Sequence, residues 1–262
     1  MKNCPTKRAL DGWDSARFTS IFLALEFFPF RGRALHPPQL TRAVRCFAKH
    51  TRKFILSRFG SDPLTFFNSV YQSIAPWDIG APQPAMAALI EKCPPANPVL
   101  DLGCGSGDLA IYLAKLGNQV VGIDFVESAI KNAQDKVASL PDETAQLIRF
   151  QVADALKPSL LQDQFGAVFD SGFYHLFNPD QCEQLIDEVA SILKPHGCYY
   201  LHEFAIEFPV PNVPRQISID ELQTRFTVEK GWRIKEIQTV EFLSRVAPPV
   251  PATCACIERL PL

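Results

Sequence analysis

The spacing of apolar residues changes repeatedly between residues 85 and 208, and each change predicts a new element. Short, continuous apolar runs are typical of strands buried on both faces of a sheet, whereas apolar residues that recur every three or four positions indicate helices. The predicted strands are residues 99–102, 119–124, 147–152, 167–170 and 198–203. The predicted helices are residues 85–92, 108–116, 128–140 and 179–193.

Strand and helix alternate with short turns, such as the one predicted at residues 194–197. This alternation is typical of an α/β fold in which a parallel sheet is covered by helices on both faces. We therefore expect a Rossmann-like, doubly wound, mostly parallel sheet in a three-layer sandwich. This domain is predicted to span residues 61–262.

The pattern changes after residue 208. Three prolines between residues 209 and 214 predict an extended loop, because proline cannot continue a helix or a central strand. Ser218 and Glu221 have the spacing of a capping box, which predicts a helix from there to about residue 226. Two closing strands are predicted, one of them antiparallel, at residues 232–242 and 251–259.

The first sixty residues differ from the rest in charge. They contain twelve Lys and Arg against three Asp and Glu, whereas the remainder contains fourteen against twenty-five. A basic arm of this kind can be an organelle transit peptide, a surface-binding tail, or an extension without a packed core. A helix is expected at residues 39–59. The apolar run at residues 18–30 is too short to cross a bilayer, which takes about 20 residues, so no membrane span is expected.

The overall composition is that of a globular protein that needs no metal. Hydrophobic residues make up 47% of the chain and charged residues 21%, values typical of a domain with an ordinary core. None of the eight cysteines forms a C-x-x-C pair, and no histidine or further cysteine completes a site at Cys254 and Cys256. We therefore expect buried, reduced thiols, no metal, and a cytoplasmic location, with an organelle as the alternative if the arm is a transit peptide.

A glycine-rich turn, Asp101-Leu-Gly-Cys-Gly-Ser-Gly107, follows the first predicted strand and opens a helix. Glycine allows a sharp turn and the close approach of a ligand, and the helix N-terminus presents free N–H groups. Asp124 ends the next predicted strand, 21 residues after Gly103. A carboxylate at that position can accept hydrogen bonds from both hydroxyls of a ribose. These features predict a nucleoside cofactor, although a glycine-rich turn alone can also serve packing.

Asp108 distinguishes between two kinds of nucleoside cofactor. The dinucleotide pattern G-x-G-x-x-G would place its third glycine at residue 108, where this chain has Asp108. An aspartate at the start of that helix would repel a pyrophosphate but would tolerate a cationic ligand. S-adenosylmethionine carries a sulfonium and an ammonium and has no phosphate, so it is the expected cofactor. A nicotinamide-dependent oxidoreductase is the rival interpretation, and a non-catalytic protein that kept the fold is the other.

Three segments resemble the motifs of class I S-adenosylmethionine-dependent methyltransferases: residues 99–107, residues 121–130 and residues 150–155. The resemblance implies that Asp124 holds the ribose and that Asp154 bonds the adenine amino group. It also implies that the glycine turn holds the methionine end. The full set of cofactor-binding residues implied in these motifs is Asp101, Gly103, Cys104, Gly105, Asp124, Phe125, Asp154 and Ala155.

A narrower resemblance lies outside these motifs. Residues 71–84, which we call the Trp77 segment, are similar to a segment of thiopurine, thiol and halide methyltransferase-like proteins, and residues 169–177 and 226–232 fit bacterial members of that group. The likeness covers about residues 65–260. It implies that the Trp77 segment folds over the cofactor, with the Trp77 indole near the sulfonium. The alternative is that Trp77 is a core residue under a loop.

The resemblance also indicates where the methyl acceptor would bind. Asp170 and Ser171 end the fourth strand, at the usual edge of the active site, and are expected to contact the cofactor. Tyr174 and His175 follow as candidate catalytic residues. His175 could deprotonate an acceptor or be a structural histidine with its hydrogen bonds satisfied. The candidates His202 and Glu203 lie at the end of the fifth strand.

The expected reaction is in-line transfer of the sulfonium methyl group to a small molecule. A thiol or another soft nucleophile, such as hydrosulfide, a halide or a chalcogen, needs little activation. An alcohol or amine would need a base, and His175 is the first candidate. We expect a small-molecule substrate, a monomer or weak homodimer, and no binding to nucleic acid or membrane.

Overall fold

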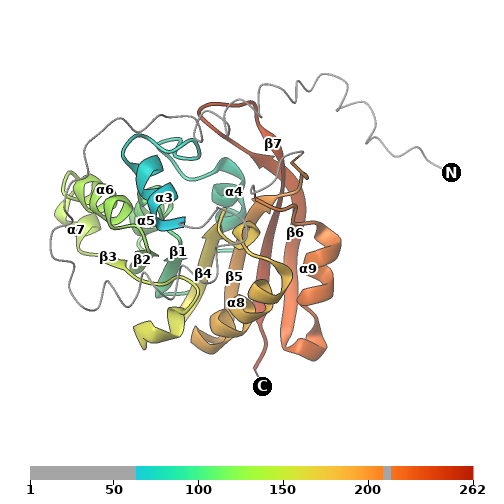
Figure 1. Cartoon of the computed structure of the whole chain (residues 1–262). Helices are drawn as coiled ribbons and strands as arrows, with labels where there is room; N and C mark the ends of the chain where they lie inside the picture. The colour runs from blue at the N-terminus through green and yellow to red at the C-terminus, as the bar shows by residue number, and fades with distance from the viewer. Residues whose placement is uncertain (1–62, 209–213, 262) are drawn as a thin grey trace. The chain divides into compact units, whose positions relative to one another are not determined.

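A seven-stranded sheet with strand order β3-β2-β1-β4-β5-β7-β6 forms the centre of the computed structural model, which describes residues 63–208 and 214–261 (Figure 1). The strands β1 to β5 are parallel to one another, and β7 runs antiparallel to both β5 and β6. This arrangement confirms the predicted fold class. The strands are β1 Val99–Leu102, β2 Val120–Asp124, β3 Ile148–Val152, β4 Phe165–Ser171, β5 Leu193–Phe204, β6 Trp232–Phe242 and β7 Val250–Arg259.

Helices cover both faces of the sheet, because each central strand is buried on both sides. Leu100 and Leu102 of β1 belong to the apolar core that includes Leu185 of α8 and Leu222 of α9. Val99 belongs to the opposite core, which α4 and α5 complete. The α-helices are α3 Pro63–Tyr71, α4 Pro84–Lys92, α5 Asp108–Lys115, α6 Glu127–Val137, α7 Asp142–Ala145, α8 Pro179–Ile192 and α9 Ile219–Arg225. Short 3₁₀ helices are η2 Pro158–Leu161, η3 Tyr174–Leu176 and η4 Val228–Lys230.

Three features differ from the prediction. The helix α3 was not predicted, although Phe67, Val70 and Tyr71 form its buried stripe. The helix α7 has no buried residue and so leaves no apolar period to detect. The turn predicted at residues 194–197 is wrong in its bounds, because β5 already begins at Leu193, beside Phe165. Its register then shifts before Cys198 pairs with Ala167. The helix expected at residues 39–59 and most of the proline loop lie outside the described residues.

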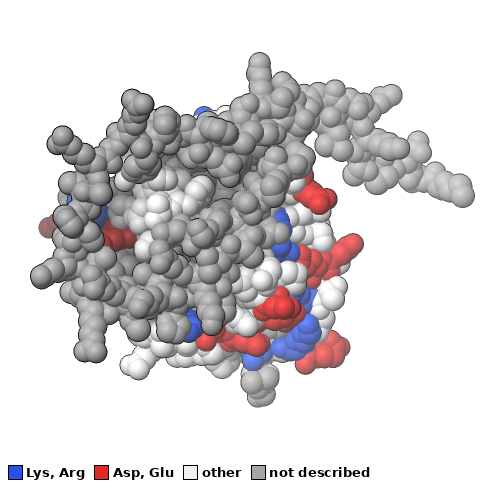
Figure 2. All heavy atoms as spheres, in the orientation of Figure 1, with Lys and Arg blue, Asp and Glu red and all other residues white. Residues whose placement is uncertain are grey.

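The surface over α8 and α9 carries charges of both signs. Lys and Arg are interspersed there with Asp and Glu on the described part of the face in Figure 2. Ion pairs join some of them, for example Arg225 to Glu183 at 2.6 Å. This mixture is typical of a solvated surface rather than of a nucleic-acid interface. Within residues 63–208 and 214–261, no helix has the length and hydropathy needed to cross a membrane.

Candidate functional site

The glycine turn lies where the carboxyl ends of the parallel strands meet, which we call the carboxyl edge. Gly103 and Gly105 have φ values of +69° and +52°, in the left-handed region that favours glycine. A Cβ atom at Gly103 would lie 2.8 Å from a ring carbon of Phe173, and one at Gly105 would lie 2.7 Å from the Tyr71 hydroxyl. The turn is therefore closely surrounded, and a side chain at either position would displace an aromatic neighbour.

Asp124 joins the end of β2 to the glycine turn. Its Oδ2 accepts a hydrogen bond from the Gly105 amide at 3.0 Å, and its Oδ1 accepts one from the Val126 amide at 2.9 Å. Burial raises the pKa of this carboxyl to about 6. Each carboxylate oxygen can accept more than one hydrogen bond, so Asp124 retains the capacity to accept from ribose hydroxyls. This is the place that the sequence predicted for the ribose.

Asp101 supplies a buried oxygen without a partner. Its Oδ2 accepts no hydrogen bond among the described residues, although the residue is only 3% exposed. Burial, together with the nearby carboxyls of Asp170 and Asp124, raises the pKa of this carboxyl to about 7. An unpartnered carboxylate beside a glycine turn is suited to a ligand ammonium group. The residues present therefore fit a cofactor that carries both an amine cation and a ribose.

The other predicted cofactor residues lie at the neighbouring strand ends. The Ala153 amide donates to the Asp124 carbonyl oxygen at 3.0 Å, which holds the end of β3 beside β2. Asp154 follows, nearly buried, and its Oδ1 accepts from the Leu156 amide at 3.0 Å. Ala155 is buried, and the ring of Phe125 meets that of Phe67 edge-on at 5.7 Å. Their contacts with adenine remain predictions, as does the contact of Cys104, which belongs to the turn itself.

The Trp77 segment packs beside the glycine turn through Tyr71. The Trp77 Nε1 donates to the Tyr71 hydroxyl at 3.3 Å, which is the same hydroxyl that lies against Gly105. Trp77 also packs on a small apolar cluster that contains Phe67 and Val126. Trp77 therefore packs in an apolar cluster, as the core interpretation expects. That cluster also borders the glycine turn, as the cofactor interpretation requires. The contact with the sulfonium remains a prediction.

A polar network fixes the Trp77 segment to the turn. The Ser106 hydroxyl donates to Asp78, and the Lys136 ammonium donates to Ser106 at 2.9 Å and to Asp108 at 2.7 Å. Asp108 was expected to repel a pyrophosphate and to tolerate a cationic ligand, and the cation that it contacts within the protein is Lys136 of α6. No signal in the sequence identified Lys136 as part of the site, because it lies 28 residues from Asp108.

His175 and Glu203 form a buried pair on the other side of the turn. The His175 Nδ1 lies 2.7 Å from the Glu203 Oε2, and the two side chains are 4% and 0% exposed. The His175 amide donates to the same Oε2 at 3.1 Å, and the imidazole stacks on Phe204 at 4.6 Å. Burial raises the pKa of Glu203 to about 7. Phe173, two residues before His175, packs on Gly103, so the pair lies close to the glycine turn.

Asp170 binds protein groups rather than projecting from the edge. Its Oδ1 accepts from the Phe173 and Tyr174 amides at 3.0 and 3.1 Å, and its Oδ2 accepts from the Tyr199 hydroxyl at 2.8 Å. Burial, and then the carboxyl of Glu203, raise the pKa of Asp170 well above its usual range. Asp170 thereby shapes the turn that leads to His175, and its predicted contact with the cofactor stays a prediction.

Ser171, Tyr174 and His202 complete the predicted candidates. Ser171 is half-buried at the end of β4. Tyr174 is fully buried, and its hydroxyl has no hydrogen-bond partner among the described residues. The His202 ring stacks on Phe242 at 4.8 Å, and burial lowers the pKa of His202 to about 4. Among Tyr174, His175 and His202, only His175 lies beside a carboxylate that can orient its ring, within the described residues.

Comparison with known proteins finds a methyltransferase family model and relatives that are named as methyltransferases. A family model described as a methyltransferase domain matches residues 99–197. A 2-heptyl-1-hydroxyquinolin-4(1H)-one methyltransferase of Mycobacteroides abscessus is 31% identical over 62% of this chain and 70% of its own length. A probable thiol methyltransferase 2 of Arabidopsis thaliana is 28% identical over 56% of this chain and 65% of its own. The chain thus spans about two thirds of these relatives.

A solved structure shares most of the fold. It is described by the words "Conversion of a Disulfide Bond into a Thioacetal Group during Echinomycin Biosynthesis". Its TM-score with this chain is 0.63, and the two sequences are 29% identical. The match covers 75% of this chain and 93% of the other. The residues that the family model matches include both the glycine turn and His175.

Proposed function

Because this chain belongs to the class I S-adenosylmethionine-dependent methyltransferases, we propose that it methylates the ionisable thiol of a small apolar molecule. S-adenosylmethionine is the cofactor. When bound, it supplies an electrophilic methyl group to a nucleophile placed in line with its sulfonium. The protein's part is to hold both reactants, exclude water and receive the proton that the acceptor loses.

The observation that carries this proposal is the buried pair of His175 and Glu203. The pair lies among aromatic rings: His175 stacks on Phe204, which packs against Phe208 and Phe242 at 5.3 and 4.7 Å. A buried imidazole held by a carboxylate through Nδ1 takes up a proton at Nε2. Such a base is useful for an acceptor with a proton to lose, and apolar surroundings favour an acceptor without charge.

A thiol suits this arrangement better than a halide. A free thiol has a pKa of about 8.5, so near neutral pH most of it must lose a proton before it can attack. A halide has no proton, and the pair would then have no role. The relative from Arabidopsis thaliana that is called a probable thiol methyltransferase also supports the thiol.

An acidic hydroxyl is the second candidate acceptor. The 31% identical relative is named for a hydroxyquinolone, and a hydroxyl needs a base more than a thiol does. The His175 Nδ1 to Glu203 distance of 2.7 Å favours this candidate as well. The same base would then receive the hydroxyl proton.

Within this proposal, one group of residues binds the cofactor and a second group handles the proton of the acceptor. Asp101 receives the ammonium of the cofactor and Asp124 receives its ribose hydroxyls, while the backbone at Gly103 and Gly105 allows its close approach. Asp154, Phe125 and Ala155 surround the adenine. His175 takes the acceptor proton, and Glu203 stabilises the imidazolium that forms.

A radiolabelled-methyl assay against a panel of acceptors tests the proposal. The panel contains thiophenol, benzyl mercaptan, a quinolinol, sodium sulfide and potassium iodide. We expect the two thiols, each of which carries a phenyl ring, to be methylated fastest and the quinolinol next. Transfer to iodide or sulfide alone would contradict the proposal, because neither small ion requires an aromatic, base-containing site. Transfer to the quinolinol alone would select the second candidate.

Cofactor affinity is expected to rise with pH between about pH 5 and pH 8 and then to level off. Burial raises the pKa of Asp101 to about 7 and that of Asp124 to about 6. Below these values the carboxyls are protonated, and they must release protons before they can pair with an ammonium or accept fully from hydroxyls. Calorimetry with S-adenosylhomocysteine in buffers of different ionisation enthalpy measures this release. Asp101→Asn should flatten the upper part of the profile, whereas a flat wild-type profile would disprove the assignment.

A further inference from the structure

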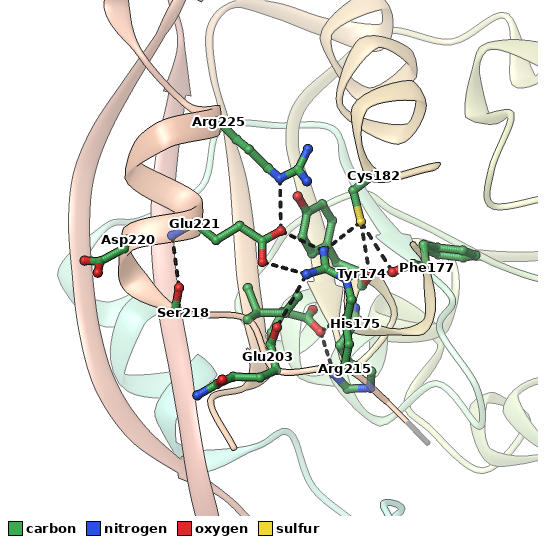
Figure 3. A network of polar contacts seen from close by, with 12 residues as sticks. Tyr174, His175, Phe177, Cys182, Glu203, Arg215, Ser218, Asp220, Glu221 and Arg225 are labelled. Atoms are coloured by element: carbon green, nitrogen blue, oxygen red, sulfur yellow. Dashed lines mark hydrogen bonds and ion pairs between the residues drawn. The ribbon is translucent and has the colours of Figure 1, made fainter. Parts of the chain in front are cut away.

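We propose that Arg215 is a positioning residue for methyl transfer, which fixes the turn that carries His175. The inference rests on the proposed role of His175 as the base. Arg215 lies 40 residues further along the chain, just beyond the proline loop, and no motif includes it. Figure 3 shows its guanidinium among Tyr174, Phe177, Cys182 and Glu221.

Arg215 contacts three residues in or directly after η3: Tyr174, His175 and Phe177. Its backbone amide donates to the His175 carbonyl oxygen at 3.0 Å. Its Nε donates to the Phe177 carbonyl oxygen at 2.7 Å, and its guanidinium lies 5.4 Å from the centre of the Tyr174 ring. The turn is thus held before, at and after His175. A cation near a tyrosine ring and charge-assisted hydrogen bonds are each favourable in a site with little water.

All five N–H groups of the Arg215 side chain have protein acceptors. Beyond the Nε contact, Nη1 donates to Glu221 at 2.6 Å and to the Gln216 carbonyl at 3.4 Å. Nη2 donates to Glu221 at 2.8 Å and to the Cys182 sulfur at 3.0 Å. A guanidinium has five such donors, so none is left over for an anionic acceptor. This usage indicates a role in holding the protein rather than in binding substrate.

Glu221 connects Arg215 to a regular element. It lies in the first turn of α9, where its amide donates to the Ser218 hydroxyl at 3.0 Å. Its carboxylate accepts hydrogen bonds from Nη1 and Nη2 of Arg215 and also from Nε of Arg225 at 2.9 Å. The bidentate geometry fixes the plane of the guanidinium. The η3 turn is therefore braced against α9 through one fixed ion pair (Figure 3).

The opposite side of His175 is held by β4 and β5. Glu203 accepts from the His175 amide and faces its Nδ1, while Asp170 accepts from the Tyr174 amide. His202 of β5 also lies near enough to the imidazole to interact with it electrostatically. With the carboxylates on one side and Arg215 on the other, the backbone at His175 has little freedom. Misplacement of a base by about 1 Å can cost a large part of its effect.

The test compares Arg215→Met and Glu221→Gln with wild type and with Arg233→Met. Arg233 is a matched control, since it is 56% exposed on β6 and pairs with Glu258 at 2.7 Å away from the site. The kinetic probes are benzyl mercaptan, which is mostly protonated near neutral pH, and thiophenol, which ionises more readily. We expect both site variants to lower kcat with benzyl mercaptan about 10-fold. The loss with thiophenol should be under about 3-fold, because an ionised acceptor needs no base. S-adenosylhomocysteine affinity should be unchanged.

Equal losses with both thiols, or a loss equal to that of Arg233→Met, would overturn the proposal. A second readout needs no acceptor. The proton between His175 Nδ1 and Glu203 Oε2, which are 2.7 Å apart, should exchange slowly in wild type. Arg215→Met should make its exchange at least about 10-fold faster in nitrogen-15 NMR spectra. Unchanged exchange in a folded variant would also overturn it. If wild type methylates neither thiol, the thiol proposal fails. The exchange measurement still tests whether Arg215 positions His175.

Discussion

His175→Asn is expected to lower kcat about 100-fold near neutral pH without changing the affinity for S-adenosylhomocysteine. The asparagine amide can still donate to Glu203 from about the position of Nδ1, so the buried carboxylate keeps a partner. The substitution removes Nε2, which is the atom proposed to take the proton. Steady-state kinetics with benzyl mercaptan and calorimetry on the same preparation measure the two effects separately.

The chain contains a matched control for this variant. His196 also contacts a glutamate through Nδ1, at 2.8 Å from Glu258, but it is 62% exposed and lies near the start of β5, away from the carboxyl edge. His196→Asn should leave kcat unchanged, and asparagine tolerates the positive φ of +63° at that position. The kcat of His175→Asn should also recover as the pH approaches that at which the thiol ionises by itself. A loss that stays constant with pH would contradict a role in proton removal.

Gly105→Ala is expected to weaken binding of S-adenosylhomocysteine by at least about 30-fold, or about 2 kcal/mol. The new Cβ would lie 2.7 Å from the Tyr71 hydroxyl, and the buried Tyr71 is hydrogen-bonded to Trp77. Relief of the clash would move Tyr71 and Trp77 together, or would move the Gly105 amide away from Asp124. Either movement disturbs the surroundings of the cofactor, which calorimetry measures directly.

Gly117→Ala separates this effect from the cost of the backbone conformation. Gly117 also has a positive φ, +87°, but among the described residues nothing beyond its own chain neighbours would lie within 4 Å of an added Cβ. Both substitutions place alanine in the left-handed region, at a cost of about 1 kcal/mol. Only Gly105→Ala adds a clash beside the proposed site. The Gly117 variant should lose stability in thermal unfolding and keep its affinity, and equal affinities for the two variants would disprove the placement of the cofactor.

Elements whose pattern is local were predicted well. The strand Trp232–Phe242 and the strand Val99–Leu102 have the predicted bounds, because turn residues flank a continuous or alternating apolar run. The Ser218 side chain accepts from the Glu221 amide as the spacing predicts. The helix α7 was missed because four residues without a buried side chain contain no period. Residues 194–197 were assigned to a turn because Pro195 and Gly197 obscured the continuation of β5.

The residues proposed to bind the cofactor could be selected from the sequence alone, and the structure brings Asp101, Gly105 and Asp124 together. Asp101, Gly103 and Gly105 are neighbours in sequence, and the order strand, turn, helix and strand brings Asp124 to them in any right-handed crossover of this kind. On the proposed acceptor side, the sequence offered His175 and Glu203 as separate candidates, and only the structure shows that they pair. His175 meets Glu203 across 28 residues, and Arg215 reaches Phe177 across 38.

The physical reason for this difference is that hydrophobic periodicity specifies which face of an element is buried, but not which polar groups meet inside. The sequence pattern places Lys136 on the exposed side of a helix. In the structure its ammonium donates hydrogen bonds to Asp108 and Ser106. The sequence pattern places Arg215 in a loop. In the structure every N–H group of its side chain donates a hydrogen bond to a protein acceptor. Such partners depend on how separate elements pack, because a buried charge is stable only where several distant acceptors converge on it.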